Sequence, residues 1–149
     1  MRGVSVRLSP TVHGDGDQGF VAILIGIARE KGVSGYVGDG ANPWPAVHRS
    51  DAARLFRLAV ESAPAGTVLH GVGEEGVPTK AIAEAIGHGL DLPAESIDPG
   101  RAGDHYGWFA PFAALGVRAS NVQTAELLDW DPDGPALLDD LAAGHYFTD

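Results

Sequence analysis

Residues 14–19 read G-D-G-D-Q-G and carry the most suggestive chemical spacing in the chain. The pattern G-x-G-x-x-G between a strand and a helix lets backbone N–H groups bind the pyrophosphate of a dinucleotide. In this loop, however, the carboxylates of Asp15 and Asp17 would repel a pyrophosphate at the helix N-terminus. The preceding strand also ends too early, because Pro10 stands where the pattern needs a buried strand residue. We therefore predict that this loop does not bind a dinucleotide.

The other residue types that could do chemistry form no recognisable motif. The six histidines include no H-E-x-x-H pair, so we predict no metal site, and the lack of cysteine excludes disulfides and thiolate nucleophiles. No G-x-S-x-G nucleophile motif occurs. Glu74 and Glu75 could form an acid–base pair, but adjacent carboxylates in a polar loop are more often solvated. We assign no catalytic residue within this chain.

Large aromatic side chains stand in stretches rich in glycine and proline, where they either fill a core or line a ligand pocket. They are Trp44, Tyr106, Trp108, Phe109 and Phe112. Trp44 lies between two prolines, which hold the backbone extended and predict a rigid loop. We expect Trp44 to be partly exposed there, which makes it the best pocket candidate among them.

The elements that must position these residues are those of an α/β chain with a few short strands and about five helices. Apolar alternation and short apolar runs predict strands over 4–8, 35–37, 46–48 and 67–72. Helical spacing predicts helices over 20–31, from about Asp51, from Pro78, and on either side of 131–135. The buried face of the second helix would consist of Ala52, Leu55, Phe56 and Ala59. Residues 11–19, 42–45 and 91–103 are expected to be irregular.

Length and composition bound the class of protein. The 149 residues suit a single unit, and 44% hydrophobic with 20% charged residues is typical of a globular chain. A formal charge of -10 argues against nucleic acid or an anionic membrane as a partner. No apolar run is long enough to span a membrane, and the N-terminus lacks the apolar segment of a signal peptide. We therefore expect a cytoplasmic protein.

Five short segments follow one another in an order known from a family of enzymes. The opening ones are R-L-S-P-T-V-H-G at 7–14, similar to R-x-P-x-x-V-Y/H-G, and then G-D-G at 38–40 and V-H-R-S-D-A-A at 47–53, similar to G-D-G…V-H-V-D-D-V-A. Later come A-I-A-E-A-I-G at 81–87, similar to a late helix, and L-L-D-W-D-P at 127–132, similar to L-G-W-x-P. Through these segments nearly the whole chain resembles the C-terminal half of extended short-chain dehydrogenases, the NAD-dependent epimerase/dehydratase family.

The resemblance implies the substrate-binding part of such an enzyme, with the N-terminal Rossmann portion absent. In the family a Tyr-x-x-x-Lys pair exchanges a proton while a hydride moves to or from the nicotinamide. The residues four positions before Lys31 and Lys80 are Ile27 and Gly76, so this chain contains no such pair. We therefore expect no turnover and no tight cofactor binding by this chain alone, with NAD or NADP bound by the complete enzyme.

The resemblance also assigns contacts to individual residues. Four residues would lie beside the nicotinamide, namely Pro10, Thr11, Val12 and His13. His48 would face the substrate pocket, whereas Asp51 is expected to cap a helix rather than act as an acid.

One departure from the family bears on the substrate. Nucleotide-sugar members usually carry an arginine between G-D-G and V-H, where it pairs with the diphosphate. Trp44 occupies that position here and cannot make a bidentate charged contact. We therefore expect a small neutral or partly apolar substrate, bound by Trp44, His48, Tyr106 and Trp108.

Two interpretations of the whole chain remain, with a weaker third. In the first, it is the substrate-binding portion of an NAD(P)-dependent oxidoreductase or epimerase, as a fragment or as one half of a split enzyme. This predicts an exposed apolar face and an unpaired edge on the opening strand, where the missing Rossmann half or a second copy of the chain would dock. In the second, it is a non-enzymatic small-ligand-binding or interaction module with its own closed core. In the third, residues 14–19 bind a nucleotide after all.

Overall fold

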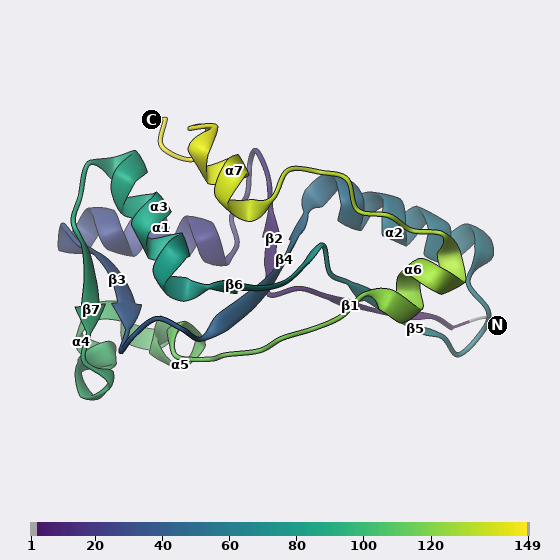
Figure 1. Ribbon diagram of the computed structural model, residues 1–149, viewed down its shortest axis with the longest axis horizontal. Helices are drawn as coiled ribbons and strands as arrows, with labels where there is room; N and C mark the ends of the chain where they lie inside the picture. The colour runs from purple at the N-terminus through teal and green to yellow at the C-terminus, as the bar shows by residue number, and fades with distance from the viewer. Residues whose placement is uncertain (1–2, 149) are drawn as a thin grey trace.

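The computed structural model describes residues 3–148 and has the mixed α/β fold that the sequence predicts (Figure 1). The strands are β1 (Ser5–Leu8), β2 (Thr11–His13), β3 (Ser34–Val37), β4 (Pro43–His48), β5 (Val68–Gly71), β6 (Glu74–Pro78) and β7 (Ala94–Ile97). The helices are α1 (Phe20–Lys31), α2 (Arg49–Ser62), α3 (Thr79–Leu90), α4 (Ala102–Tyr106), α5 (Ala110–Ala113), α6 (Val122–Leu128) and α7 (Leu137–Ala142). Short 3₁₀ turns cover Pro99–Arg101 and Gly107–Phe109.

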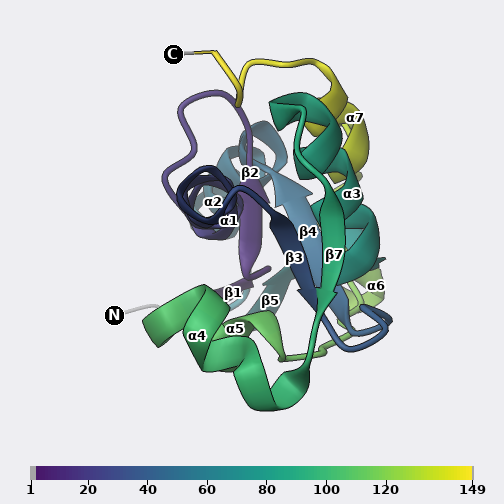
Figure 2. The same ribbon diagram turned by 90° about the vertical axis from the view of Figure 1, so that its left-hand side faces the viewer.

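The strands form three small sheets rather than one large one. β1 pairs in parallel with β5, and β3 pairs in parallel with β7. The third sheet has the order β2-β4-β6, in which β2 and β4 are parallel and β4 and β6 are antiparallel. Its register places His13 opposite His48. The end-on view shows β3, β7 and β4 flanked by α1 on one side and α3 on the other (Figure 2).

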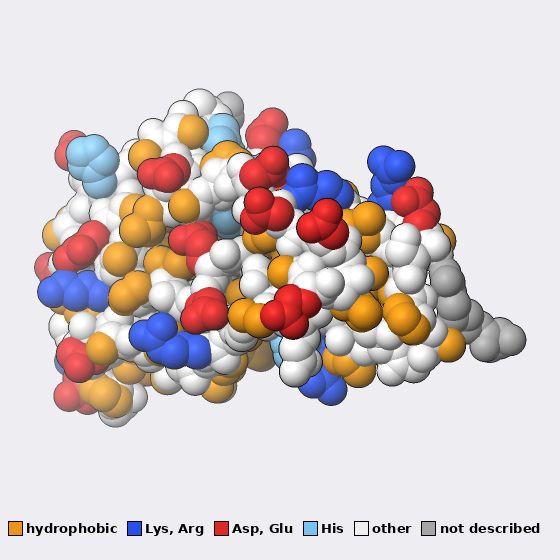
Figure 3. All heavy atoms as spheres, turned by 45° about the vertical axis from the view of Figure 1, so that its right-hand side comes forward, with side chains coloured by type: hydrophobic (Ala, Val, Ile, Leu, Met, Phe, Trp, Pro, Cys, Tyr) orange, Lys and Arg blue, Asp and Glu red, His pale blue; other side chains and the backbone are white. Residues whose placement is uncertain are grey.

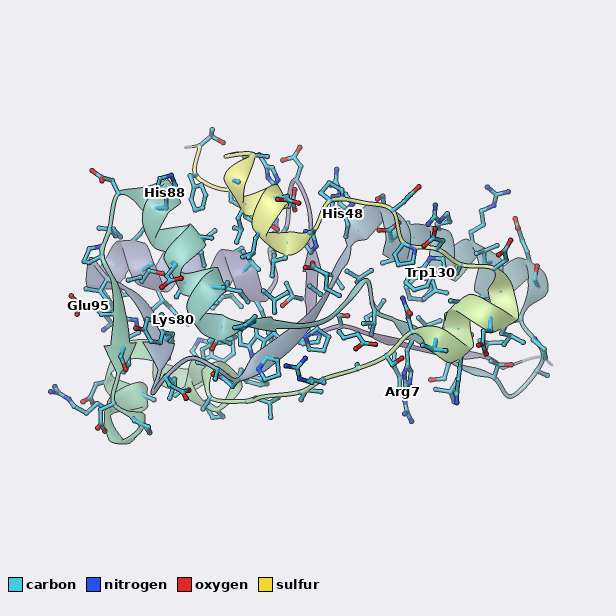
Figure 4. The ribbon with its side chains drawn as sticks, viewed as in Figure 1. Arg7, His48, Lys80, His88, Glu95 and Trp130 are labelled. Atoms are coloured by element: carbon cyan, nitrogen blue, oxygen red, sulfur yellow. The ribbon has the colours of Figure 1, made fainter. Side chains whose placement is uncertain are left out.

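Two hydrophobic cores lie along the long axis of the molecule. The larger one joins α1, α3, α7 and the aromatic residues around α4. The smaller one lies between α2, α6 and the β1–β5 sheet and contains Leu55, Leu69 and Trp130. Figure 4 shows Trp130 between α2 and α6. Each core forms because its helices turn one apolar face inward, as the helical spacing predicts.

The long helices agree closely with the sequence. α1 runs over Phe20–Lys31 as expected, and Gly32 ends it in the left-handed conformation, which costs glycine no steric penalty. α2 buries Ala52, Leu55 and Ala59. Phe56, however, is 46% exposed, so its predicted place in the buried face is wrong. It lies at the border of that face, where the smaller core ends and no further element covers it among the described residues.

The prediction that several stretches are irregular is largely wrong, because these stretches contain short strands. Residues 11–13 form β2, 94–97 form β7, and the supposed polar loop at Glu74 is β6. The supposed loop at 42–45 belongs to β4, in spite of its two prolines. The β4–β6 register shifts between Trp44 and Ala46, so Pro45 falls at a bulge where no ladder hydrogen bond is needed.

Candidate functional site

Three of the four residues expected to flank the nicotinamide form β2, Pro10 stands just before it, and the four alternate in direction. Thr11 and His13 are buried, whereas Pro10 is exposed and Val12 is half-buried. This follows from the period of two along a strand. The His13 ring lies 5.3 Å from the ring of His48, nearly perpendicular to it. The structure therefore brings His13 and His48 together, and of the four residues only Pro10 and Val12 present surface.

Asp140 of α7 joins two histidines through its carboxylate. Its Oδ2 lies 2.7 Å from Nδ1 of His13, and its Oδ1 lies 2.8 Å from Nε2 of His145. Burial pushes the pKa of Asp140 upward, but the hydrogen bonds and charges of His13 and His145 outweigh this effect and hold the pKa below its ordinary value. An ionised carboxylate only accepts hydrogen bonds, so both imidazole nitrogens that face it carry hydrogen.

Hydrogen bonds within the chain already engage the glycine loop at 14–19. The Gly14 N–H donates to the Tyr146 hydroxyl at 3.0 Å, and that hydroxyl donates to Oδ2 of Asp17 at 2.8 Å. The Gly19 N–H donates to Oδ1 of Asp17 at 2.6 Å. Burial raises the pKa of Tyr146, and Asp17 raises it further. The Asp17 N–H donates to the Gly14 carbonyl at 3.1 Å, so three amides of the loop are engaged within the chain. The loop also holds the carboxylates of Asp15 and Asp17, which adds to the sequence argument against a pyrophosphate site.

Asp51 lies in the first turn of α2, as expected, but it binds a different segment from the one predicted. Its oxygens accept hydrogen bonds from the backbone N–H groups of Asp133 and Gly134, at 3.2 and 2.9 Å. The N-cap of α2 is His48, whose Nδ1 accepts from the Ser50 N–H. Asp51 is therefore a buried anchor for the loop before α7, and the expectation that it caps its own helix is wrong.

The aromatic residues expected in the substrate pocket behave differently from one another. Trp44 is 2% exposed, and its Nε1 donates to the carbonyl of Leu115 at 2.9 Å, so the expectation of a partly exposed loop residue is wrong. The indole lies in the larger core, against Phe109. Tyr106 is also buried, and burial raises its pKa. Trp108 is 70% exposed and thus has a large surface available to a ligand.

The predicted substrate residues do not form one cluster. His48 ends β4 at the start of α2, near the middle of the molecule, whereas α4 lies at the opposite end from α2 (Figures 1 and 4). Tyr106 ends α4 and Trp108 follows it in the next turn. Trp44 occupies the other end of β4 from His48 and contacts the aromatic group. A ligand bound by His48 and Trp108 together would therefore have to reach along the molecule.

The β1–β5 sheet has one protected edge and one open edge. On the outer edge of β5, the His70 N–H donates to Oγ1 of Thr124 at 2.7 Å, and Nδ2 of Asn121 donates to the Val72 carbonyl just beyond the strand. On β1, the N–H groups of Ser5 and Ser9 donate to the β5 side. Because successive residues direct their backbone groups to opposite edges, Val6 and Leu8 direct theirs to the other edge, where no strand pairs among residues 3–148.

An apolar hollow lies beside this open edge. A cavity of about 320 Å³ is lined by Val4, Val6, Phe56, Ala59 and Val60. We call these five residues the β1–α2 surface. Figure 3 shows this end of the molecule from the side of α6, where hydrophobic side chains lie among charged ones. The opening strand thus has the unpaired edge and the exposed apolar face that the first interpretation predicts.

Sequence reasoning missed the contacts made by the C-terminal segment. Asp140 binds His13 and Tyr146 binds Asp17 across more than a hundred residues of chain. His145 binds Asp140 from within the same segment. No motif in the sequence marks these contacts. The described residues contain no group of three side chains suited to a metal ion. Within the same residues, no helix is long and apolar enough to cross a membrane.

The sequence of the chain was compared with family models and with curated proteins. No family model matches the chain. It is 47% identical to an uncharacterized protein of Schizosaccharomyces pombe over 147 residues, which cover 99% of this chain and 50% of that protein. It is 46% identical to an uncharacterized protein of Saccharomyces cerevisiae, with 97% and 49% covered. The chain therefore spans about half the length of the curated relatives that it matches.

Solved structures show the same fold at low sequence identity. An epimerase from Methanothermobacter thermautotrophicus superposes with a TM-score of 0.74 at 16% identity, covering 99% of this chain and 43% of that one. A dTDP-glucose 4,6-dehydratase from Streptomyces venezuelae, with NAD bound, superposes with a TM-score of 0.71 at 16% identity, covering 97% and 42%. The chain thus has a fold found within NAD-dependent epimerases and dehydratases and matches less than half of each.

Proposed function

We propose that this chain is the substrate-binding portion of an NAD(P)-dependent oxidoreductase or epimerase, and that the dinucleotide-binding portion docks on the β1–α2 surface. The observation that carries the proposal is the open edge of β1. The chain protects β5 with Thr124 and Asn121, yet it leaves Val6 and Leu8 without a strand partner among the described residues. A parallel strand of another portion would extend the β1–β5 sheet and cover the apolar hollow.

The length of the curated relatives also supports the docking of a dinucleotide-binding portion on the β1–α2 surface. About half of each curated relative lies outside the match to this chain. A β1–β5 pair of two parallel strands is unusual by itself, because parallel sheets are normally larger and covered on both faces. A further parallel sheet supplied by the unmatched portion would complete it.

The residues of this chain are better suited to contact the nicotinamide ring of a cofactor than to bind the cofactor's phosphates. Pro10 and Val12 present apolar surface on β2, which suits contact with a nicotinamide ring, whereas Thr11 and His13 point into the fold. When bound, the nicotinamide would accept or donate the hydride. This chain would exclude water from one side of the ring and shape the substrate pocket, and the choice between NAD and NADP would lie with the docked portion.

The substrate that we propose is a small neutral or partly apolar molecule. The family position that pairs with a diphosphate is held here by Trp44, which is uncharged and buried in the core. Its burial removes Trp44 itself from the proposed pocket. His48, which is half-buried beside His13, remains as the side chain that would contact the substrate. Trp108 is exposed but follows α4 at the other end of the molecule, so it would not reach the same small molecule (Figure 1).

The proposal is tested by supplying a candidate for the dinucleotide-binding portion. This chain is mixed with the segment of the Schizosaccharomyces pombe protein that it does not match, and complex formation and NAD binding are measured by calorimetry. We expect a one-to-one complex that binds NAD, while this chain alone binds none. Phe56→Glu should weaken the complex at least tenfold, because it places a charge in an apolar interface.

Leu127→Glu is the matched control, since Leu127 is 47% exposed on α6 and lies outside the β1–α2 surface. It should leave the complex unchanged. A monodisperse monomer that neither joins the complementary segment nor changes on Phe56→Glu would contradict the proposal and would favour the non-enzymatic binding module.

A further inference from the structure

The last part of the chain returns to the strand that carries the proposed cofactor contacts. Residues 137–148, which we call the C-terminal strap, comprise α7 and the residues after it. α7 packs beside α3 (Figure 1). The strap is bonded to β2 through Asp140 and to the following loop through Tyr146. Its first N–H, that of Leu137, donates to Oε2 of Glu74 at 2.7 Å.

Asp140 controls the hydrogen-bonding state of the His13 ring. The carboxylate accepts from Nδ1 of His13, so in the neutral imidazole Nε2 carries the lone pair. Nε2 is buried and has no hydrogen-bond partner among the described residues. Nothing described on the far side of the ring therefore competes with Asp140 for the tautomer, and the carboxylate decides it.

The same strap fixes the backbone directly after His13. The Gly14 N–H is held by the Tyr146 hydroxyl, and that hydroxyl is held by Asp17. His145 binds the second oxygen of Asp140 and comes within 4.0 Å of Asp15. The C-terminal strap thus holds both the end of β2, through Asp140, and the loop that follows, through Tyr146.

We propose that Asp140 is a positioning residue, which, together with Tyr146, holds β2 and the 14–17 loop in place through the C-terminal strap. Under the proposed function, on which its catalytic relevance rests, this fixes Pro10 and Val12 against the cofactor. The burial of His13 supports a positioning role, because a side chain 1% exposed cannot itself meet a ligand at the surface.

The first test replaces Asp140 by asparagine in the chain as it stands. An asparagine side chain has one acceptor oxygen and one donor nitrogen, so it cannot accept from both histidines. In Asp140→Asn, we expect one of the two imidazoles to change its tautomer or lose its hydrogen bond, seen in ring ¹⁵N NMR spectra. Asp139→Asn makes the same chemical change on the neighbouring exposed residue and should leave both rings as they are.

The second test follows the loop itself and does not require Asp140→Asn to fold. Tyr146→Phe removes one hydroxyl, and hydrogen exchange of the Gly14 amide should become about tenfold faster. Exchange at Gly38, whose N–H donates to the Ile97 carbonyl and involves neither the strap nor the 14–19 loop, serves as the internal reference. Unchanged imidazole signals in Asp140→Asn, or unchanged Gly14 exchange in Tyr146→Phe, would overturn the inference.

A third measurement separates this inference from the proposed function. In the complex with the complementary segment, Asp140→Asn should weaken NAD binding about tenfold, and Asp139→Asn should not. If that complex binds no NAD at all, the proposed function fails. The imidazole and exchange results of the isolated chain would still decide whether the strap positions β2.

Discussion

At the scale of single residues, the fold depends on carboxylates that bind partners far away in the sequence. Asp51 binds the loop before α7, Glu74 binds the first turn of α7, and Asp140 binds two histidines. Charge-assisted hydrogen bonds of this kind are stronger than neutral ones, and a buried donor that loses its acceptor is costly. The acidic excess of the chain is therefore partly structural rather than solely a solvated surface.

The contribution of Asp51 can be measured directly. Asp51→Ala removes the acceptor of the Asp133 and Gly134 N–H groups and of Arg54, and we expect the free energy of unfolding to fall by about 2 kcal/mol. Urea unfolding provides the measurement. Asp133→Ala, which removes an exposed carboxylate near Arg54, should cost less than about 1 kcal/mol. Equal losses in the two variants would contradict the anchoring role.

Asp140 predicts a specific dependence of stability on pH. Because its pKa is lower in the folded state than its ordinary value of about 3.9, the ionised carboxylate stabilises the fold above that value. This stabilisation is lost as the pH falls through the folded-state pKa. The stability difference between the wild-type chain and Asp140→Asn should be constant near neutral pH and shrink below about pH 4. Thermal unfolding across pH 2–7 tests this, and a difference that grows towards acid pH would refute it.

At the scale of elements, the close contact between α3 and the strap depends on the lack of a side chain at one position. A Cβ at Gly89 of α3 would stand 2.1 Å from the ring of Phe147, well inside contact distance. Helical glycine is otherwise less favourable than alanine by about 1 kcal/mol. Glycine at position 89 therefore lowers the helix propensity of α3 but leaves room for Phe147 of the strap to pack on it.

Two glycine substitutions with opposite expected effects test this packing. Gly26→Ala, in α1 with nothing within 4 Å of the added atom, should raise stability by up to about 1 kcal/mol. Gly89→Ala should lower it by about 1–3 kcal/mol, because the methyl group displaces Phe147. In a Phe147→Ala background, the cost of Gly89→Ala should vanish. A cost that persists there would show that the strap is not what Gly89 accommodates.

At the scale of the whole molecule, two cores share one chain but differ in closure. The larger core is covered by α1, α3, α7 and the aromatic turn, whereas the smaller one ends at the open edge of β1. Most proteins protect such edges by charges, prolines or covering loops. The formal charge of -10 opposes close approach of two copies, but β1 and the β1–α2 surface carry no acidic residue.

We therefore expect the chain without its proposed partner to self-associate reversibly through this edge. Sedimentation equilibrium should detect dimers that become more populated at high salt, since salt screens the negative charge of the two copies. Phe56→Glu should shift the chain to monomer, and Leu127→Glu should not. A monomer at all salt concentrations, or loss of the dimer in Leu127→Glu, would contradict the assignment of this surface.

The accuracy of the sequence-based predictions followed the range of the interactions involved. α1 and its end at Gly32 were predicted correctly, because helix periodicity and capping are local. β2 and β7 were missed, because their sequences T-V-H and A-E-S-I lack the apolar alternation or apolar run that marked β1 and β5. The burial of Trp44 was missed because the rings that enclose its indole, those of Phe20 and Phe109, come from distant parts of the chain.

The sequence by itself determined the α/β class, the long helices and the lack of a Tyr-x-x-x-Lys pair, because these depend on composition and on spacing along the chain. Only the tertiary structure decided which residues near the proposed site are free to meet a ligand. Thr11 and His13 are buried, Val12 is half-buried against the smaller core, and Pro10 before the strand is exposed. Asp140 binds His13 from 127 residues away. Such a contact needs two distant segments to meet, and the chain carries no local signal that they will.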